Sequence, residues 1–240
     1  MFKDLKPKAV LLDLYGTLID IWTDEQRPEV WDKLARFLRY RGLQADARTI
    51  KGTFFSLAQT FYAASNEKYA EVDVASIFRT ILSDLGYDGP APFLTEVAQL
   101  FRTLSMLRFD LFPDTLSTLR ALRGAFKLGL VSDAQRAFFD PEMKMTGLDL
   151  LLEVIVVSSD HGFRKPDRRL FDLALSELGT SPEQTIYVGD NIDRDIHGAK
   201  SAGLQAILID RDGLQDGANC IYKPDQIFRG LDELRRWLLD

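Results

Sequence analysis

Polar residues that could take part in catalysis stand directly after apolar runs at several points along this chain. Asp13 ends V-L-L-D and precedes L-Y-G-T, and Ser132 ends G-L-V-S. Lys165 lies in G-F-R-K-P-D, and Asp190 and Asp195 lie in G-D-N-I-D-R-D. A carboxylate can act as a nucleophile or as a ligand of a hard cation, and a lysine can balance the charge around it. Their chemistry depends on whether the fold brings these side chains together.

Short β-rich runs alternate with helical patterns in most of the chain. The β-rich runs are 8–15, 126–132, 152–158, 185–190 and 205–210, and the helical segments lie near 114–123, 134–146, 167–178, 192–202 and 226–238. We expect Asp114 to cap the first of these helices, and Asp140 and Pro141 to begin a late-starting helix within 134–146. The alternation predicts a parallel sheet, and ligands bind beyond the carboxyl ends of such strands. The residues named above follow these ends, so we expect them at one edge of the sheet.

The segment between the first two strands shows helical patterns only. Apolar residues recur at helical spacing in four sets, which begin at Val30, Ile50, Val74 and Leu94. We therefore predict a Rossmann-like α/β core with helices on both faces of its sheet, formed by 1–20 and 109–240. The helical segment 21–108 is expected to form an inserted α-helical cap domain.

Composition and charge narrow the functional classes. The net charge is −6 and the sequence pI is about 5.1, which argues against a nucleic-acid-binding or anionic-membrane-binding surface. Cys220 is the only cysteine, so no internal disulfide is possible, and we read it as a small core residue. The first residues do not resemble a signal peptide, and we expect a cytoplasmic protein. The sequence does not indicate an oligomeric state.

Four motifs in order resemble those of the haloacid dehalogenase-like (HAD) hydrolase superfamily. They are D-L-Y-G-T at 13–17, the strand-ending Ser132, Lys165 in K-P-D, and G-D-N-I-D-R-D at 189–195. Each motif alone has an ordinary structural reading, such as a helix cap for Ser132 or a solvated loop for Lys165. All four in sequence order are specific, and the helical insert lies where this superfamily carries a cap domain.

The resemblance implies a role for each matched residue. Asp13 would be the nucleophile that forms a covalent aspartyl intermediate, and Ser132 and Lys165 would hold the transferring group. Asp13, Asp190 and the backbone carbonyl of Tyr15 would bind Mg²⁺, with Asp195 in or just behind the metal shell. Backbone N–H groups of Leu14, Tyr15 and Ala134 would face the phosphate. Asp133, where the superfamily often has Asn, would lie beside the substrate.

Tyr15 departs from the phosphatase pattern. Phosphatases of this superfamily usually carry a second Asp there, which protonates the leaving alkoxide, whereas D-x-Y-G-T resembles the 2-haloacid dehalogenases. Because Asp13, Asp190 and Asp195 would be hard to keep ionised beside Lys165 alone, we favour a bound divalent cation.

The sequence therefore predicts a Mg²⁺-dependent phosphatase-type hydrolase that acts on a small phosphorylated metabolite. A 2-haloacid dehalogenase is the first alternative, although the insert shows no clear match for the arginine that receives the halide in those enzymes. A catalytically idle binding protein that kept the fold is the second alternative.

Overall fold

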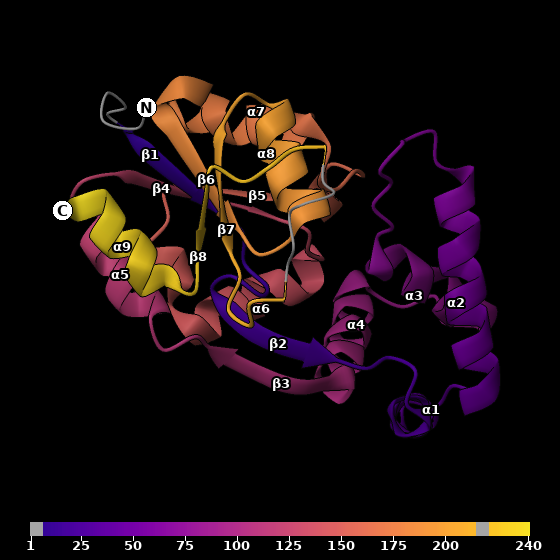
Figure 1. The fold of residues 1–240 in the computed structure, drawn as a ribbon. Helices are drawn as coiled ribbons and strands as arrows, with labels where there is room; N and C mark the ends of the chain where they lie inside the picture. Colours follow the sequence, from indigo (N-terminus) through magenta and orange to yellow (C-terminus); the bar gives the residue numbers. More distant parts are fainter. Residues whose placement is uncertain (1–6, 215–220) are drawn as a thin grey trace.

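The computed structural model describes residues 7–214 and 221–240, and its centre is a parallel sheet of six strands (Figure 1). In spatial order the strands are β5 (Val154–Val157), β4 (Lys127–Ser132), β1 (Ala9–Leu12), β6 (Thr185–Gly189), β7 (Gln205–Ile209) and β8 (Gln226–Phe228). Leu12 at the end of β1 stands opposite Leu130 of β4 and Val188 of β6. The carboxyl ends of these three central strands therefore lie side by side.

Helices cover both faces of this sheet, as predicted. Val10 and Leu12 of β1 face one apolar cluster, and Ala9 and Leu11 face another, because successive strand residues point to opposite faces. The first cluster lies under α5 (Thr115–Leu122), α6 (Arg136–Thr146) and α9 (Leu231–Leu239), and the second lies under α7 (Arg168–Leu178) and α8 (His197–Ser201). The α/β prediction is confirmed.

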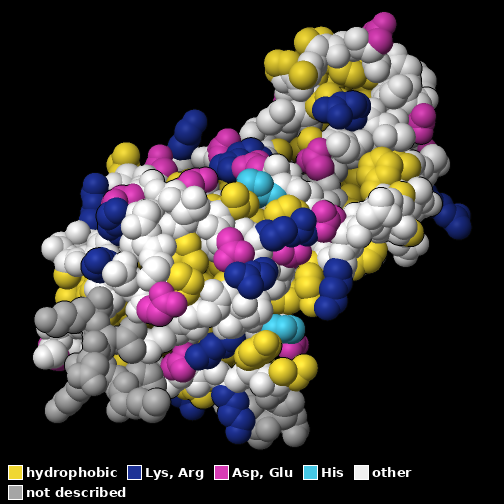
Figure 2. Space-filling model, turned by 90° about the horizontal axis from the view of Figure 1, so that it is seen from above, with side chains coloured by type: hydrophobic (Ala, Val, Ile, Leu, Met, Phe, Trp, Pro, Cys, Tyr) yellow, Lys and Arg dark blue, Asp and Glu magenta, His cyan; other side chains and the backbone are white. Residues whose placement is uncertain are grey.

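The four helices expected in the insert are present and share a core of their own. They are α1 (Pro28–Tyr40), α2 (Ala47–Ala64), α3 (Val74–Asp84) and α4 (Ala91–Ser105). Rings of Trp31, Phe54, Phe78 and Phe101 meet in this core, with centroids 4.9–5.4 Å apart in most pairs. The helices form a lobe beside the sheet, which is also visible from above (Figures 1 and 2).

Two antiparallel strands that the sequence reading missed connect this lobe to the sheet. They are β2 (Ile19–Thr23) and β3 (Met106–Leu111), and they lie between the two parts of the molecule (Figure 1). The strand β3 follows α4 directly, so the apolar spacing of the helix did not show where β3 begins. Both expected limits of the insert, at 21 and 108, fall inside these strands, and the domain division stays a prediction.

Two helix limits were predicted wrongly. The helix α6 begins at Arg136 rather than at Asp140, and Pro141 lies inside it. A proline cannot donate a hydrogen bond to the carbonyl four residues earlier. The Nε2 group of Gln99 donates to that carbonyl, at Ala137, over 3.1 Å, and so the helix tolerates the proline.

The expected helix 226–238 is the short edge strand β8 followed by α9. Cys220 lies outside the described residues, so its predicted place in a core stays open. Within residues 7–214 and 221–240, no helix combines the length and the apolarity that crossing a membrane requires.

Candidate active site

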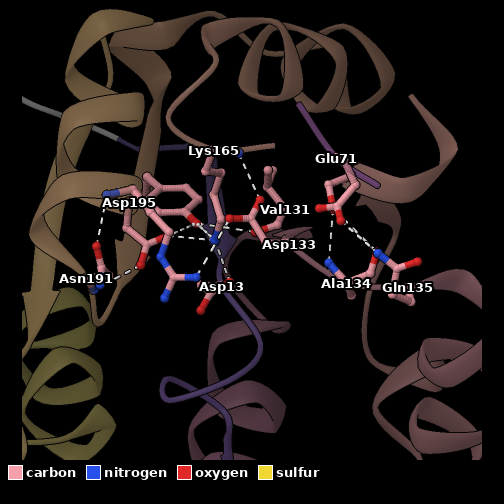
Figure 3. A network of polar contacts seen from close by, with 12 residues as sticks. Asp13, Glu71, Val131, Asp133, Ala134, Gln135, Lys165, Asn191 and Asp195 are labelled. Carbon is pink, nitrogen blue, oxygen red and sulfur yellow. Dashed lines mark hydrogen bonds and ion pairs between the residues drawn. The ribbon is translucent and has the colours of Figure 1, made fainter. Parts of the chain in front are cut away.

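Lys165 lies at the centre of a buried polar network beyond the carboxyl ends of β1, β4 and β6 (Figure 3). Its Nζ donates to Asp13 Oδ1, to Asp195 Oδ1 at 2.6 Å and to the Tyr187 hydroxyl at 3.1 Å. Burial disfavours the ammonium ion, but Asp13 and Asp195 outweigh it and raise the pKa of Lys165. The lysine is therefore a fixed positive charge beside Asp13.

Asp195 is held by two further contacts. Its Oδ1 also accepts from the Tyr187 hydroxyl at 2.8 Å, and its Oδ2 accepts from the Asn191 N–H at 2.9 Å. Tyr187 is fully buried on β6, and its hydroxyl also lies 3.3 Å from the Val131 carbonyl. The sequence reading missed Tyr187, although a phenol within the buried run T-I-Y-V-G-D is a signal that could have identified it.

Asp13, Asp190 and Asp195 form a cluster of acids. One carboxylate oxygen of each lies within 4.8 Å of the other two. Burial, with the charge of Asp195 adding to it, raises the pKa of Asp190 to about 6. Burial also raises the pKa of Asp13 well above its ordinary value, and Lys165 opposes this. Three carboxylates with one ammonium ion leave excess negative charge, and oxygen donors of this kind suit Mg²⁺.

Gly16 allows the acids to approach the loop after β1. Its φ is +88°, which favours glycine, and a Cβ at this position would overlap the Asp190 carboxylate. The D-L-Y-G-T motif thus places Asp190 directly against the backbone of the loop that carries Asp13.

Ser132 lies at the end of β4 with a buried hydroxyl that has no hydrogen-bond partner in the described part of the chain. A buried hydroxyl without a partner is costly, and a substrate oxygen could supply one. Asp133 Oδ1 accepts from the Lys165 backbone N–H at 2.8 Å, so Asp133 fixes the loop of the third motif. The N–H of Ala134, which was expected to face the phosphate, donates instead to Ser158 Oγ at 3.1 Å.

Tyr15 turns its hydroxyl to a partner that the sequence did not indicate. It donates to Glu142 of α6, which is 3% exposed. Glu142 Oε1 accepts from Arg102 Nε of α4 at 2.7 Å, and the guanidinium lies 5.3 Å from the centre of the Tyr15 ring. Burial, and after it the charge of Glu142, raises the pKa of the phenol. Tyr15 thus remains protonated and bonded to Glu142.

A cavity of about 320 Å³ lies over Tyr15, between the sheet and the helical lobe. Its polar walls include Glu71, Arg102, Asp133 and Gln135. Glu71, from the segment between α2 and α3, accepts from Ser158 Oγ and from Gln135 Nε2, each at 2.7 Å (Figure 3). The helical lobe therefore contributes directly to the walls of the space beside the catalytic candidates.

Curated relatives of this chain are named as phosphatases. A glyceraldehyde 3-phosphate phosphatase of Methanothermobacter thermautotrophicus is 34% identical in an alignment 193 residues long, and the match covers 67% of this chain and 85% of that protein. The glyceraldehyde 3-phosphate phosphatase of Methanopyrus kandleri is 33% identical, over 58% of this chain and 60% of its own length. A phosphoserine phosphatase of Thermus thermophilus is 32% identical, over 56% of this chain and 53% of its own length. The chain thus spans little more than half the length of these last two relatives.

Solved structures of both phosphatases and dehalogenases resemble the fold. A HAD phosphatase from Thermococcus onnurineus is 26% identical with a TM-score of 0.62, over 97% of this chain and 98% of that one. A 2-haloacid dehalogenase from Pseudomonas syringae pv. Tomato DC3000 has a TM-score of 0.70 over the same shares at 22% identity, a likeness of fold alone. Residues 7–203 match the family described as haloacid dehalogenase-like hydrolase. The chain belongs to this family of hydrolases.

Proposed function

We propose that this protein is a Mg²⁺-dependent phosphatase that hydrolyses a small phosphorylated metabolite through an aspartyl-phosphate intermediate. The observation that carries the proposal is the cluster of Asp13, Asp190 and Asp195 around Lys165, within 4.8 Å of one another. The phosphatase names of the relatives support the same reaction class.

Asp13, Asp190 and the Tyr15 backbone carbonyl would hold the Mg²⁺ ion. Asp195 would stand behind them, because both of its oxygens already accept hydrogen bonds from protein groups. When bound, Mg²⁺ would neutralise charge on the phosphoryl group and on the acids.

The protein's own residues would carry out the transfer in two steps. A carboxylate oxygen of Asp13 attacks phosphorus, the bond from phosphorus to the ester oxygen breaks, and the alcohol oxygen leaves with the bonding electrons. Water then attacks phosphorus of the aspartyl-phosphate, and the bond from phosphorus to the Asp13 oxygen breaks, which releases phosphate and restores the Asp13 carboxylate. The proton that this water loses balances the proton that the alkoxide takes up. Lys165 holds the Asp13 carboxylate in place, and Ser132 supplies a hydroxyl to a phosphoryl oxygen.

The bond from Tyr15 to Glu142 bears on the choice of leaving group. A general acid typically contributes about 10²–10⁴ in rate. The phenol proton of Tyr15 is directed at Glu142, and its raised pKa makes it a poor donor. We infer faster hydrolysis of aryl and acyl phosphates, whose leaving groups need little protonation, than of alkyl phosphates.

A 2-haloacid dehalogenase is the second candidate, because Tyr15 matches that motif and Arg102 of the helical lobe lines the cavity beside it. Two observations weigh against this candidate. Arg102 is already paired with Glu142, and a carboxylate at Asp190 adds negative charge that a metal-free reaction does not need.

The experiment is a panel of p-nitrophenyl phosphate, acetyl phosphate and 2-chloropropionate, each with Mg²⁺ and with EDTA. We expect phosphate release that requires Mg²⁺ and is abolished in Asp13→Asn, which keeps the size of the side chain but removes the nucleophile. Beryllofluoride should bind wild-type protein and not this variant. Chloride release that is insensitive to EDTA would establish the dehalogenase instead.

A further inference from the structure

The cavity over Tyr15 adjoins the site proposed for the phosphoryl group, so its walls would contact the leaving group. It is closed on one side by α6 and on the other by the segment that carries Glu71 and by β2. Because its volume is about 320 Å³, at the small end of ligand pockets, it suits a compact alcohol.

The charges on these walls are unbalanced. Glu71 and Asp133 are acids, and Arg102 is the one cation among the residues that line the cavity. Both Nε and Nη2 of Arg102 are directed at Glu142, so the arginine charge is already neutralised. Asp133 is likewise paired, with Arg194 at 3.9 Å, whereas Glu71 accepts from a hydroxyl and an amide, which are uncharged donors. A leaving group with a negative charge would therefore meet the Glu71 carboxylate, and the lining cation Arg102 is already paired.

Two hydrogen-bond donors on the walls, the Gln135 amide and the Tyr15 phenol, are engaged with acidic partners. The Nε2 group of Gln135 donates to Glu71 and to the Val72 carbonyl, and the phenol of Tyr15 donates to Glu142. Each carboxylate oxygen of Glu71 accepts one hydrogen bond and has the capacity for another. Glu71 thus offers acceptor positions in the cavity to a leaving group that carries hydrogen-bond donors.

An aromatic surface completes the cavity. Trp22 of β2 lines it with 59% of its surface exposed, and Phe138 and Ile21 supply the rest of the apolar wall. An exposed indole face attracts a cation, and the Glu71 carboxylate in the same lining would balance the positive charge.

We propose that the substrate is the phosphate monoester of a small amino alcohol, whose ammonium group lies between Trp22 and Glu71. The proposal rests on the phosphatase function proposed above and names the substrate class of the same site. It predicts that a carboxylate on the leaving group weakens binding.

The test compares four phosphate esters as competitive inhibitors of p-nitrophenyl phosphate hydrolysis, so that slow turnover of alkyl esters does not obscure binding. The esters are ethyl phosphate, O-phosphoethanolamine, O-phosphoserine and 2-phosphoglycolate, whose leaving groups carry no charge, an ammonium, both charges and a carboxylate. We expect O-phosphoethanolamine to bind about ten- to a hundredfold more tightly than 2-phosphoglycolate, with the other two esters between them.

Glu71→Gln should reduce that ratio severalfold, because the amide keeps the size and acceptor but loses the charge. The matched control is Glu96→Gln, which removes an exposed carboxylate of α4 that pairs with Arg41, away from the cavity. This control should leave the ratio unchanged.

The outcomes separate the two proposals. If p-nitrophenyl and acetyl phosphates are not hydrolysed with Mg²⁺, the phosphatase function itself fails. If they are hydrolysed but 2-phosphoglycolate competes as well as O-phosphoethanolamine, or neither competes at the highest concentration tested, the amino alcohol proposal is overturned. A ratio that Glu71→Gln does not change would remove the role of Glu71.

Discussion

Replacement of Asp190 by Asn should stabilise the protein without Mg²⁺ and remove the stabilisation that Mg²⁺ brings. The ionised Asp190 side chain destabilises the folded protein, because burial and the charge of Asp195 raise its pKa to about 6 from an ordinary 3.8. A carboxyl group with a raised pKa binds its proton more tightly in the folded state. The stability that protonated Asp190 contributes to the folded state is therefore fully present below pH 3.8 and is lost as the pH rises through about 6.

The size of the effect follows from this difference. Raising the pKa from 3.8 to about 6 corresponds to about 3 kcal/mol at neutral pH, at 1.36 kcal/mol per pH unit. Solvent reaches part of this side chain and screens its charge, so we expect about 1–2 kcal/mol. For a chain of this length, 1 kcal/mol corresponds to about 2–4 °C in Tm, so Asp190→Asn should melt about 2–8 °C higher in EDTA at pH 7.5.

In Mg²⁺, wild type should melt at a higher temperature than Asp190→Asn, the reverse of their order in EDTA. Saturation to 100 times Kd stabilises a folded protein by about 2.7 kcal/mol. Wild type should gain this stabilisation, whereas the variant lacks a carboxylate ligand and should gain little. At pH 4.5 the advantage of the variant in EDTA should fall to about a third, because the wild-type carboxyl is then mostly protonated in the folded state.

Thermal melts at pH 7.5 and 4.5, in EDTA and in Mg²⁺, measure all of these quantities. The control is Asp149→Asn, which removes an exposed carboxylate remote from the site and should shift Tm little under every condition. A variant that melts below wild type in EDTA at pH 7.5 would refute the electrostatic argument. Equal Mg²⁺ gains in both proteins would refute the role of Asp190 as a ligand.

Three other variants test neighbouring features. Tyr15→Asp should raise the hydrolysis rate of an alkyl phosphate by up to about 10²-fold and leave that of p-nitrophenyl phosphate little changed, measured at one pH. Gly16→Ala should unfold at a lower temperature than Gly42→Ala in thermal melts, because both residues have a φ of +88° but only at Gly16 would a Cβ meet a carboxylate. Arg102→Met should lower the free energy of unfolding in urea by about 3–5 kcal/mol, because Glu142 is then buried without its ion-pair partner. The double variant with Glu142→Met should recover most of that loss.

Much of the fold and the meeting of the catalytic candidates could be predicted from sequence. Short apolar runs that each end in a polar residue identify parallel strands, and the geometry of such a sheet then brings Asp13, Ser132 and Asp190 to one edge. This inference requires no side-chain contact, only that the strands are neighbours. The strands β2 and β3 were missed because they are short and because β3 directly continues a helical pattern.

Contacts between distant elements could not be predicted in this way. Glu142 lies 127 positions after Tyr15 and 40 after Arg102. In the sequence Glu142 is one acid among several in a helix that was expected to begin at Asp140. No local pattern distinguishes a buried glutamate that accepts from a phenol from one that faces solvent.

The contacts of Tyr15 give this residue a structural role that its departure from the phosphatase motif does not reveal. In the sequence, this position shows only that a second aspartate is missing. In the structure, the phenol is one member of a chain that joins the loop of the nucleophile to Glu142 of α6 and to Arg102 of the helical lobe. Since Arg102 can pair with Glu142 only while the lobe lies against α6, the position of the lobe is linked to the loop that carries Asp13. A carboxylate at position 15 would have no proton to donate to Glu142 at neutral pH. The connection from the lobe to the loop of the nucleophile therefore requires a hydrogen-bond donor at this position, and the Tyr15 hydroxyl is that donor.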